Sequence, residues 1–359
     1  MAIVTDNQLV TIHENNGQPL FQFNTTDYST LTWTREQNNP STMDLAVPPI
    51  NGMSWISQTA PWVHWSTVWD GDNGSVLWTG PIQKISQSRN GGLVINAKDP
   101  SSYLARTRSP ESKMWANTDP ALIAQELWRR MGDRKGLRAD PIALVDVENH
   151  GYDYTATADD RLLDQVMSEL VDMGMVWTVV SGVPILGPVT KTPVAALSEV
   201  DFIGDDTLVL VRDGTSMFND VMVRAEGSET TAHIDYYGQS LETIKNLDHI
   251  SGVSNVQAAA QAYVGLVGRV RTRLQAPNGA QLHPRAPLTI DQLIPSTRFT
   301  ISSGDVLEMM QLTRVEVSRS SGATAVKITP ESVLTPGEIT DLELNTATSS
   351  KKSSAGTSR

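Results

Sequence analysis

The sequence predicts a mainly β protein with an α/β insertion, and three observations support this prediction. Residues 62–99 read as three consecutive antiparallel strands, separated by turns at 70–74 and 90–92. The Asp-Gly and Asn-Gly pairs in these turns tolerate the positive φ of tight hairpins. Apolar and polar residues alternate from 93 to 98, as in a strand with one buried face. The 25 glycines and 19 prolines among 359 residues suit a turn-rich chain.

A first β block is predicted over residues 1–106. The segment at 30–34 alternates with period two, so that Leu31 and Trp33 share one face. Early strands are expected at 3–4, 9–12, 20–23 and 30–34.

Tryptophan is concentrated in this block, which holds five of the nine in the chain: Trp55, Trp62, Trp65, Trp69 and Trp78. Such a cluster on strands is typical of a barrel core or a subunit interface. We therefore interpret Trp62, Trp65, Trp69 and Trp78 as core or interface anchors. A carbohydrate-binding platform is the alternative.

Residues 107–188 are predicted to form the insertion, with two helices and a hairpin. The first helix follows the capping sequence Thr118-Asp119-Pro120 and is expected to end at Gly132. The second is expected to open near Asp159 or Asp160 and to end at Gly174. The hairpin is expected over residues 175–186.

A second β block is predicted over residues 189–334. It includes one helix that starts near Asn255 and ends in the cations Arg269, Arg271 and Arg273, which suit the negative end of a helix dipole. Strands are expected at 208–211 and 221–225 around an Asp213-Gly214 turn, and at 233–237, 288–290, 299–301 and 311–318. A closing hairpin turns at 320–322.

Residues 335–359 are predicted to be a C-terminal extension that is disordered or bound to a partner. From residue 345 onward, Ser, Thr and Lys predominate, and such a segment cannot compensate for the entropy of ordering.

Two hairpins, over residues 83–99 and 313–330, close the two β blocks in a similar way. Both have amphipathic strands and turn on glycine. Two interpretations are open: a duplication, which would give two similar barrels in one chain, or the chance recurrence of a common kind of hairpin.

Composition excludes several classes of function. With no cysteine, the chain has neither disulfides nor thiolate metal sites. The formal net charge is −12, and the sequence lacks the basic stripe expected of a duplex-binding protein. The densest basic cluster, at residues 129–138, is interpreted as a solvated helix end. We expect no signal peptide and no membrane-spanning segment.

No motif predicts catalysis. The six histidines show no HxH or HxxxH spacing, and the sequence holds no GxSxG motif, P-loop or GxGxxG fingerprint. An aspartate-rich stretch at 153–164 lacks the spacing of a calcium loop. We therefore predict no catalytic residue, no metal and no cofactor. A hydrolase of cell-wall polymers, which would use a pair of carboxylates, remains an open alternative.

The meander resembles a segment of minor tail proteins of long-tailed phages. The resemblance is carried by Trp78-Thr79-Gly80-Pro81, a returning hairpin, Ala97-Lys98-Asp99 and the following Tyr103-Leu104-Ala105-Arg106. These proteins form baseplate hubs or tail tips and are related to the spike hubs of type VI secretion. The order of the first β block, the α/β insertion and the second β block matches the order of domains in these hub proteins over about residues 1–335.

The resemblance implies two β-barrel tube-type domains, at 1–106 and 189–334, separated by a small α+β domain at 107–188. It implies a structural virion component, not an enzyme, at the distal end of the tail. Three copies would form a hub ring that continues the tail tube, anchors distal tail proteins and lets DNA pass without specific binding. Tail-tube proteins would lie above the ring, and spike or fibre proteins below it. The alternative is a host-receptor or carbohydrate-binding tail protein that uses the tryptophan-rich block.

Overall fold

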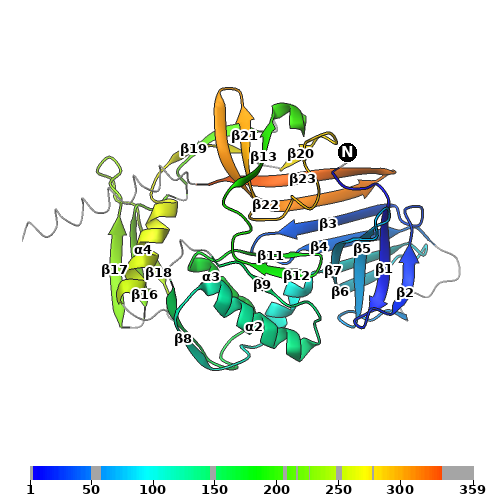
Figure 1. Cartoon of the computed structure of the whole chain (residues 1–359), viewed down its shortest axis with the longest axis horizontal. Helices are drawn as coiled ribbons and strands as arrows, with labels where there is room; N and C mark the ends of the chain where they lie inside the picture. The colour runs from blue at the N-terminus through cyan, green and yellow to red at the C-terminus, as the bar shows by residue number, and fades with distance from the viewer. Residues whose placement is uncertain are drawn as a thin grey trace, which may run out of the picture.

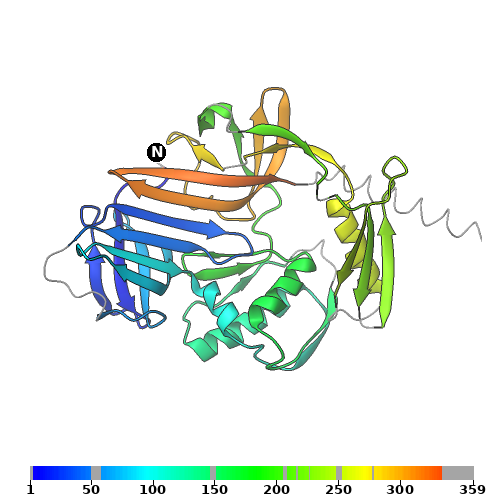
Figure 2. The same ribbon diagram turned by 180° about the vertical axis from the view of Figure 1, so that it is seen from behind.

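The computed structural model describes residues 3–49, 58–145, 151–204, 208–215, 217–225, 227–247, 253–276 and 279–333. A long curved sheet crosses the molecule, and helices pack below it in Figure 1. A small unit made of one helix and three strands lies at one side (Figures 1 and 2). Trp55 and the predicted C-terminal extension lie outside the described residues.

The first β block consists of seven strands and one 3-10 helix among the described residues, and its last three strands form the predicted meander. Its strands are β1 (Gln8–Glu14), β2 (Pro19–Phe23), β3 (Thr30–Glu36), β4 (Thr42–Val47), β5 (His64–Asp70), β6 (Val76–Gln87) and β7 (Leu93–Lys98), followed by the 3-10 helix η1 (Pro100–Arg106). The alternation in β7 is confirmed, because Leu93, Ile95 and Ala97 are buried. Ile3 and Val4 are buried but do not form a strand.

The insertion contains both predicted helices and the predicted hairpin. Its elements are β8 (Lys113–Thr118), α2 (Pro120–Lys135), β9 (Ile142–Ala143), β10 (Tyr152–Ala156), α3 (Leu163–Asp172), β11 (Trp177–Val180) and β12 (Val183–Leu186). The β11–β12 turn has positive φ at Ser181 and Gly182, as a tight hairpin requires.

The last block is also mainly β. Its elements are β13 (Pro193–Ser198), η2 (Glu199–Asp201), β14 (Phe202–Ile203), β15 (Val209–Asp213), β16 (Asp220–Ala225), β17 (Ser228–His233), β18 (Glu242–Asn246), α4 (Val253–Val267), β19 (Arg271–Gln275), β20 (Ala280–Leu282), β21 (Arg298–Ser303), β22 (Val306–Ser320) and β23 (Ala323–Ser332). The closing hairpin is confirmed, with positive φ at Ser321 and Gly322.

One sheet joins the two β blocks. Among the described residues it holds 13 strands, and its main path runs β14-β20-β23-β22-β3-β4-β7-β6-β5-β1-β2. The junction is the antiparallel pair β3–β22, in which Trp33 lies opposite Val317. One core beneath the sheet draws residues from both blocks, including Leu31, Ile95 and Ile328. The prediction of two barrel-type domains therefore stays a prediction, while the mainly β class is confirmed.

Strand β6 is where the sheet bends. Its first half pairs with β5, with Trp65 opposite Pro81, and its second half pairs with β7, with Ile82 opposite Ala97. Pro81 has no N–H to donate, so the ladder is interrupted where the partner changes. The strands on the two sides of this bend run in clearly different directions in Figure 1.

A second core lies below the sheet, between α2, α3 and the small sheet β11-β12-β9. The helices contribute Leu127, Trp128, Val166 and Leu170, all fully buried. The same core includes residues of β16 and α4, which belong to the predicted second β block at 189–334. The predicted domain ranges remain predictions, and this core extends across the predicted boundary near residue 188.

Two helix boundaries differ from expectation. The helix α2 continues through Gly132 and ends at Lys135, and the next residue, Gly136, provides the left-handed cap with a φ of 67°. The expected capping by Asp119 is confirmed, because its side chain accepts from the N–H of Ala121. The helix α3 begins at Leu163, later than expected, because Arg161 and Leu162 first pair with residues 108–109 of the neighbouring strand-like segment.

Three expectations in the last block are corrected. Strand β15 pairs with β19 instead of forming a hairpin with β16, which pairs with β17 and β18. Residues 271–275 are strand β19 and not the end of a helix. Strand β17 lies at 228–233, earlier than expected.

Residues 288–290 are irregular, although Leu288 and Ile290 are buried. The Ile290 N–H donates to the Ile3 carbonyl, and the Ile290 carbonyl accepts from Arg35. These backbone groups are therefore not available for a strand ladder.

Candidate assembly interface

The residues that carry the tail-protein resemblance form one corner of the fold. Gly80 lies in β6 against the end of β7. A Cβ on Gly80 would be 2.0 Å from the Lys98 carbonyl oxygen and 2.7 Å from the Asp99 Cα. Only glycine permits this approach of two backbones. The motif therefore encodes the bend of the sheet.

Asp99 is the buried cap of this corner. Its carboxylate accepts from the N–H and hydroxyl of Ser101 and from the N–H of Ser41. Burial raises the pKa of Asp99 from 3.8 to about 6, although the hydrogen bonds from Ser101 and Ser41 oppose the rise. These hydrogen bonds join the end of β7 to the start of η1 and to the segment before β4, which is a structural role.

The four predicted tryptophan anchors fall into two groups. Trp78 and Trp65 are buried, at 2% and 8% exposure. Trp62 and Trp69 are half-buried, and the Trp69 indole N–H donates to the Thr11 hydroxyl at 2.8 Å. A carbohydrate platform needs exposed ring faces. Trp65 and Trp78 do not present such faces.

Trp62 belongs to a small aromatic cluster at the edge of the corner. Its ring lies 5.2 Å from that of Tyr103, and the Arg106 guanidinium lies 5.8 Å from its centroid. The Tyr103 hydroxyl donates to the Trp62 carbonyl at 3.3 Å, and burial raises the pKa of that hydroxyl. Neighbouring Val63 is 57% exposed. This cluster therefore remains a candidate contact point.

The face of the large sheet opposite its core is polar. One cross-strand row, here called the polar row, runs Ser318, Thr32, Asp44, Asn96 and Lys84 across five strands. All five residues are half-buried or exposed. Their neighbours along each strand, such as Val317 and Ile95, point into the core. This face therefore presents small polar groups and single charges to solvent.

Charges of both signs are paired near the polar row. Arg314 lies 2.9 Å from a carboxylate oxygen of Glu316 and 3.6 Å from one of Glu36. The Asn96 amide donates to Asp44. The face is therefore not a basic surface for nucleic acid.

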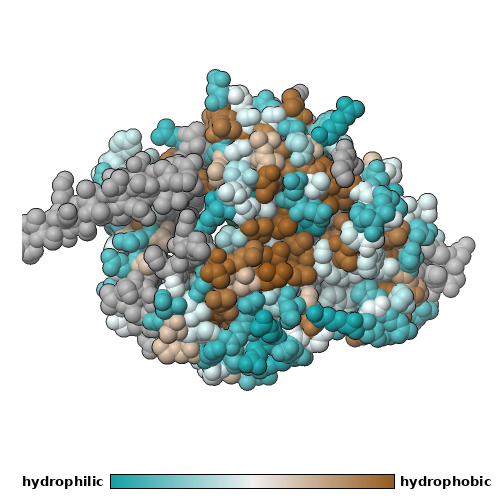
Figure 3. Space-filling view, in the orientation of Figure 1, coloured by the Kyte–Doolittle hydropathy of each residue, from teal (hydrophilic) through white to brown (hydrophobic). Residues whose placement is uncertain are grey.

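The small sheet and the residue two positions after β9 carry an apolar strip, in which Ile142 and Val145 are exposed and Val183 and Ile185 are half-buried. Ile142 and Ile185 lie side by side in parallel strands β9 and β12. Ile142 and Val145 are 49% and 50% exposed. Figure 3 shows an apolar area over these strands. Apolar surface grouped in this way is typical of a contact with another protein.

Nothing in the described ranges forms a cluster of three or more His, Asp or Glu that could hold a metal ion. No helix within those ranges has the length and apolar character needed to cross a bilayer. The predictions of no cofactor and no catalysis stay predictions.

The most unusual buried group, Arg35, was missed by sequence reasoning. It is 2% exposed, and its guanidinium donates to the carbonyls of Ile290, Leu293 and Leu77. Burial lowers its pKa to about 10, and the charge of Asp291 opposes this. The alternation that places Leu31 and Trp33 on the core side places Arg35 there as well, so this pattern in the sequence already indicated a buried Arg35.

The chain has the fold found in prophage tail proteins. It is similar to the 43 kDa tail protein of prophage MuSo2 from Shewanella oneidensis, with a TM-score of 0.62, 12% identity, and coverage of 91% of this chain and 98% of that one. It is equally similar to a tail protein from Neisseria meningitidis MC58, with a TM-score of 0.62, 12% identity, and coverage of 90% and 97%.

Prophage tail protein gp18 from Listeria monocytogenes EGD-e is a further neighbour, with a TM-score of 0.56, 9% identity, and coverage of 95% and 98%. No protein-family model matches the chain, and no curated protein matches its sequence. The resemblance to phage tail proteins is therefore confirmed at the level of the fold.

Proposed function

We propose that this chain is a structural subunit of a phage tail tip, where three copies form a hub ring that continues the tail tube. The observation that carries the proposal is the likeness to prophage tail proteins over nearly the full length of both chains. A shared fold does not by itself imply a shared function. The surfaces described above add independent support.

The polar row fits the lumen of such a ring. DNA must slide past this surface without binding, which requires few unpaired cations. The row has one carboxylate and one ammonium group among small polar side chains, and Arg314 nearby is paired with carboxylates. In this arrangement the core side of the sheet faces away from the lumen.

The apolar strip fits a contact between neighbouring subunits. Subunit interfaces are centred on apolar side chains and surrounded by a polar rim. Ile142, on the small sheet that α2 supports, and Val145, just beyond the end of β9, offer such a centre. Tail-tube proteins above the ring, and spike or fibre proteins below it, complete the proposed assembly in the virion.

The test is the mass of the isolated chain in solution and its change in a variant. Mass photometry of the full chain, alone and with the tail-tube protein, is expected to show a species of three chains. Ile142→Asp combined with Val145→Asp should shift that species to the monomer. Leu307→Asp, which changes a 72% exposed residue on β22, is the matched control and should leave the ring intact.

A folded monomer in both conditions would contradict the ring. An equal loss of the three-chain species in Leu307→Asp would contradict the assignment of the apolar strip to the contact between subunits. Degradation of host envelope polymers by the purified chain would replace the structural role with a catalytic one.

A further inference from the structure

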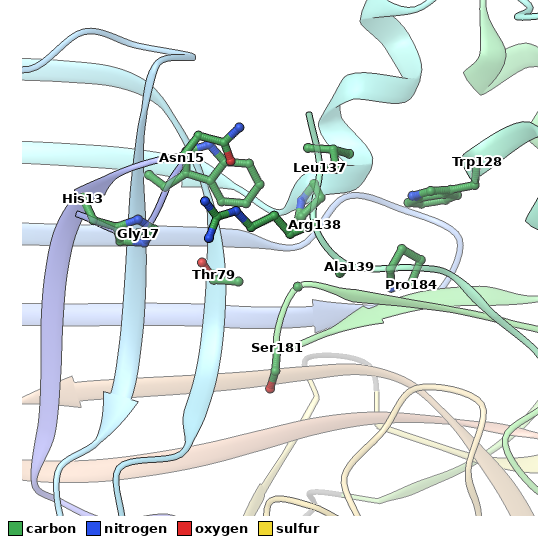
Figure 4. A pocket seen from close by; sticks show the side chains of 13 residues that line it. His13, Asn15, Gly17, Thr79, Trp128, Leu137, Arg138, Ala139, Ser181 and Pro184 are labelled. Atoms are coloured by element: carbon green, nitrogen blue, oxygen red, sulfur yellow. The ribbon is translucent and has the colours of Figure 1, made fainter. Parts of the chain in front are cut away.

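A pocket lies where the first β block meets the insertion, and its use is independent of ring formation. Its volume is about 220 Å³. The strands β1, β5 and β6 form one wall, while α2, the segment after it and the β11–β12 turn form the other (Figure 4). The two walls are fixed relative to each other, because the Ser181 hydroxyl donates to the Val76 carbonyl at 2.6 Å.

One hydrogen-bond donor in the pocket wall has no partner among the described residues. Trp128 is 1% exposed, and within the described part of the chain its indole Nε1 is buried without a hydrogen-bond acceptor. Figure 4 shows the nitrogen edge of this ring directed toward the side where Arg138 and Ala139 lie. A buried N–H without a partner costs about 1–3 kcal/mol. This nitrogen is closed off from the open space of the pocket, so a ligand acceptor reaches it only when the side chains beside it shift, and that contact would then add affinity.

The pocket also holds one uncommitted cation. Arg138 is exposed and forms no hydrogen bond or ion pair with the described residues. His13 is already engaged, because its ring nitrogens lie 2.7 Å from the Thr67 hydroxyl and 2.7 Å from the Glu14 carbonyl. The described lining includes no Asp or Glu. The electrostatic preference of the pocket is therefore for an anion.

Between these two polar points the lining is largely apolar. Leu137, Ala139 and Pro184 lie near Trp128 in Figure 4, and Trp65 and Pro100 also line the space. Such walls fit a flat apolar body.

We propose that this pocket binds an aromatic carboxylate that carries a hydrogen-bond acceptor at its far end. The carboxylate pairs with Arg138, the ring packs on the apolar wall, and the acceptor takes the Trp128 N–H. The same chemistry is found in a free hydroxyphenyl acid and in a peptide that ends in tyrosine. The experiment distinguishes these two sources.

The probe is 3-(4-hydroxyphenyl)propionate, titrated into the full chain and followed by calorimetry and by the indole N–H resonance of Trp128. A Trp128→Phe variant assigns that resonance. We expect a Kd on the order of 0.1–1 mM, as suits a small ligand. The Trp128 resonance should move as the pocket fills. The amide of the probe, which lacks the charge, should bind at least tenfold more weakly, and 3-phenylpropionate, which lacks the acceptor, should also bind more weakly.

Arg138→Gln should weaken binding at least tenfold. Arg129→Gln is the matched control, because Arg129 lies on α2, the helix that precedes Arg138, outside the pocket, and among the described residues its ion pair is an exposed one with Asp140 at 3.8 Å. A Gly-Gly-Tyr peptide with a free carboxylate would identify a peptide terminus as the ligand if it binds more tightly than the free acid, and a free acid as the ligand if it binds more weakly. Equal binding of acid and amide, an unmoved Trp128 resonance, or an equal effect of both arginine variants would each overturn the proposal.

Discussion

Gly80 and Lys98 meet backbone to backbone at the corner of the sheet. A side chain on Gly80 would lie 2.0 Å from the Lys98 carbonyl oxygen. Neither backbone can swing away, because Gly80 is held in β6 and Lys98 in β7. The corner therefore depends on the absence of one methyl group.

Gly80→Ala should lower the free energy of unfolding by about 3–5 kcal/mol or prevent folding. The matched control is Gly132→Ala within α2, where a Cβ would lie 3.8 Å from the Leu137 Cβ, an ordinary contact. That change should raise stability by about 0.5–1 kcal/mol, because alanine favours helix. Urea unfolding followed by circular dichroism measures both. Equal stabilities of Gly80→Ala and the natural chain would refute the role of the corner.

Asp99 should make stability depend on pH between about 4 and 6. Burial raises its pKa from 3.8 to about 6, so the folded state holds the proton more tightly than the unfolded state. Its contribution to stability is therefore full below pH 4 and is lost as pH rises through 6. The expected loss is on the order of 3 kcal/mol.

The measurement is the unfolding free energy of the natural chain and of Asp99→Asn across this pH range. The difference between the two should change with pH, because the variant cannot ionise. Asp140→Asn, at an exposed carboxylate, should track the natural chain at every pH. A constant difference for Asp99→Asn would show that its carboxyl titrates normally.

Arg35 stabilises the core by binding three carbonyl groups. Arg35→Met would leave the carbonyls of Ile290, Leu293 and Leu77 without this donor. We expect a loss of about 3–5 kcal/mol in the free energy of unfolding. The free energy of unfolding of Arg35→Lys should lie between those of the natural chain and Arg35→Met, because an ammonium cannot reach all three acceptors. Arg314→Met, at an exposed ion pair, should cost less than about 1 kcal/mol.

Alanine substitutions of the tryptophan anchors should lower the stability of the protein by different amounts. Trp78→Ala removes a buried ring from the main core and should cost about 3–5 kcal/mol. Trp69→Ala removes a half-buried ring and one hydrogen bond, so its cost should be about 1–2 kcal/mol. Thermal or urea unfolding compares them. Similar losses for both would contradict the assignment of Trp78 to the core and Trp69 to the surface.

Local patterns predicted much of the fold. The meander, the β11–β12 hairpin and the Asp119 cap depend on residues close in sequence, and the structure confirms them. Pairings between distant segments were not accessible in the same way. The β3–β22 pair joins residues such as Trp33 and Val317, and no turn or period in either strand specifies the partner.

The buried Arg35, the apolar strip and the pocket also divide into what local patterns predict and what depends on contacts between distant segments. Alternation within β3 was sufficient to place Arg35 in the core, yet a charged residue is rarely expected there. The apolar strip needed the pairing of Ile142 with Ile185, and the pocket needed Trp128 and Arg138 to meet the first β block. These relationships arise only when separate elements pack.

The central claim is that copies of this chain form a ring at the distal end of a phage tail. Cryo-electron microscopy of the tail tip in intact virions tests it most directly. Three copies around the tube axis, with Thr32, Asp44 and Asn96 facing the lumen, are the predicted result. Copies of the chain at any other place in the virion, or a ring in which this face points away from the axis, would contradict it.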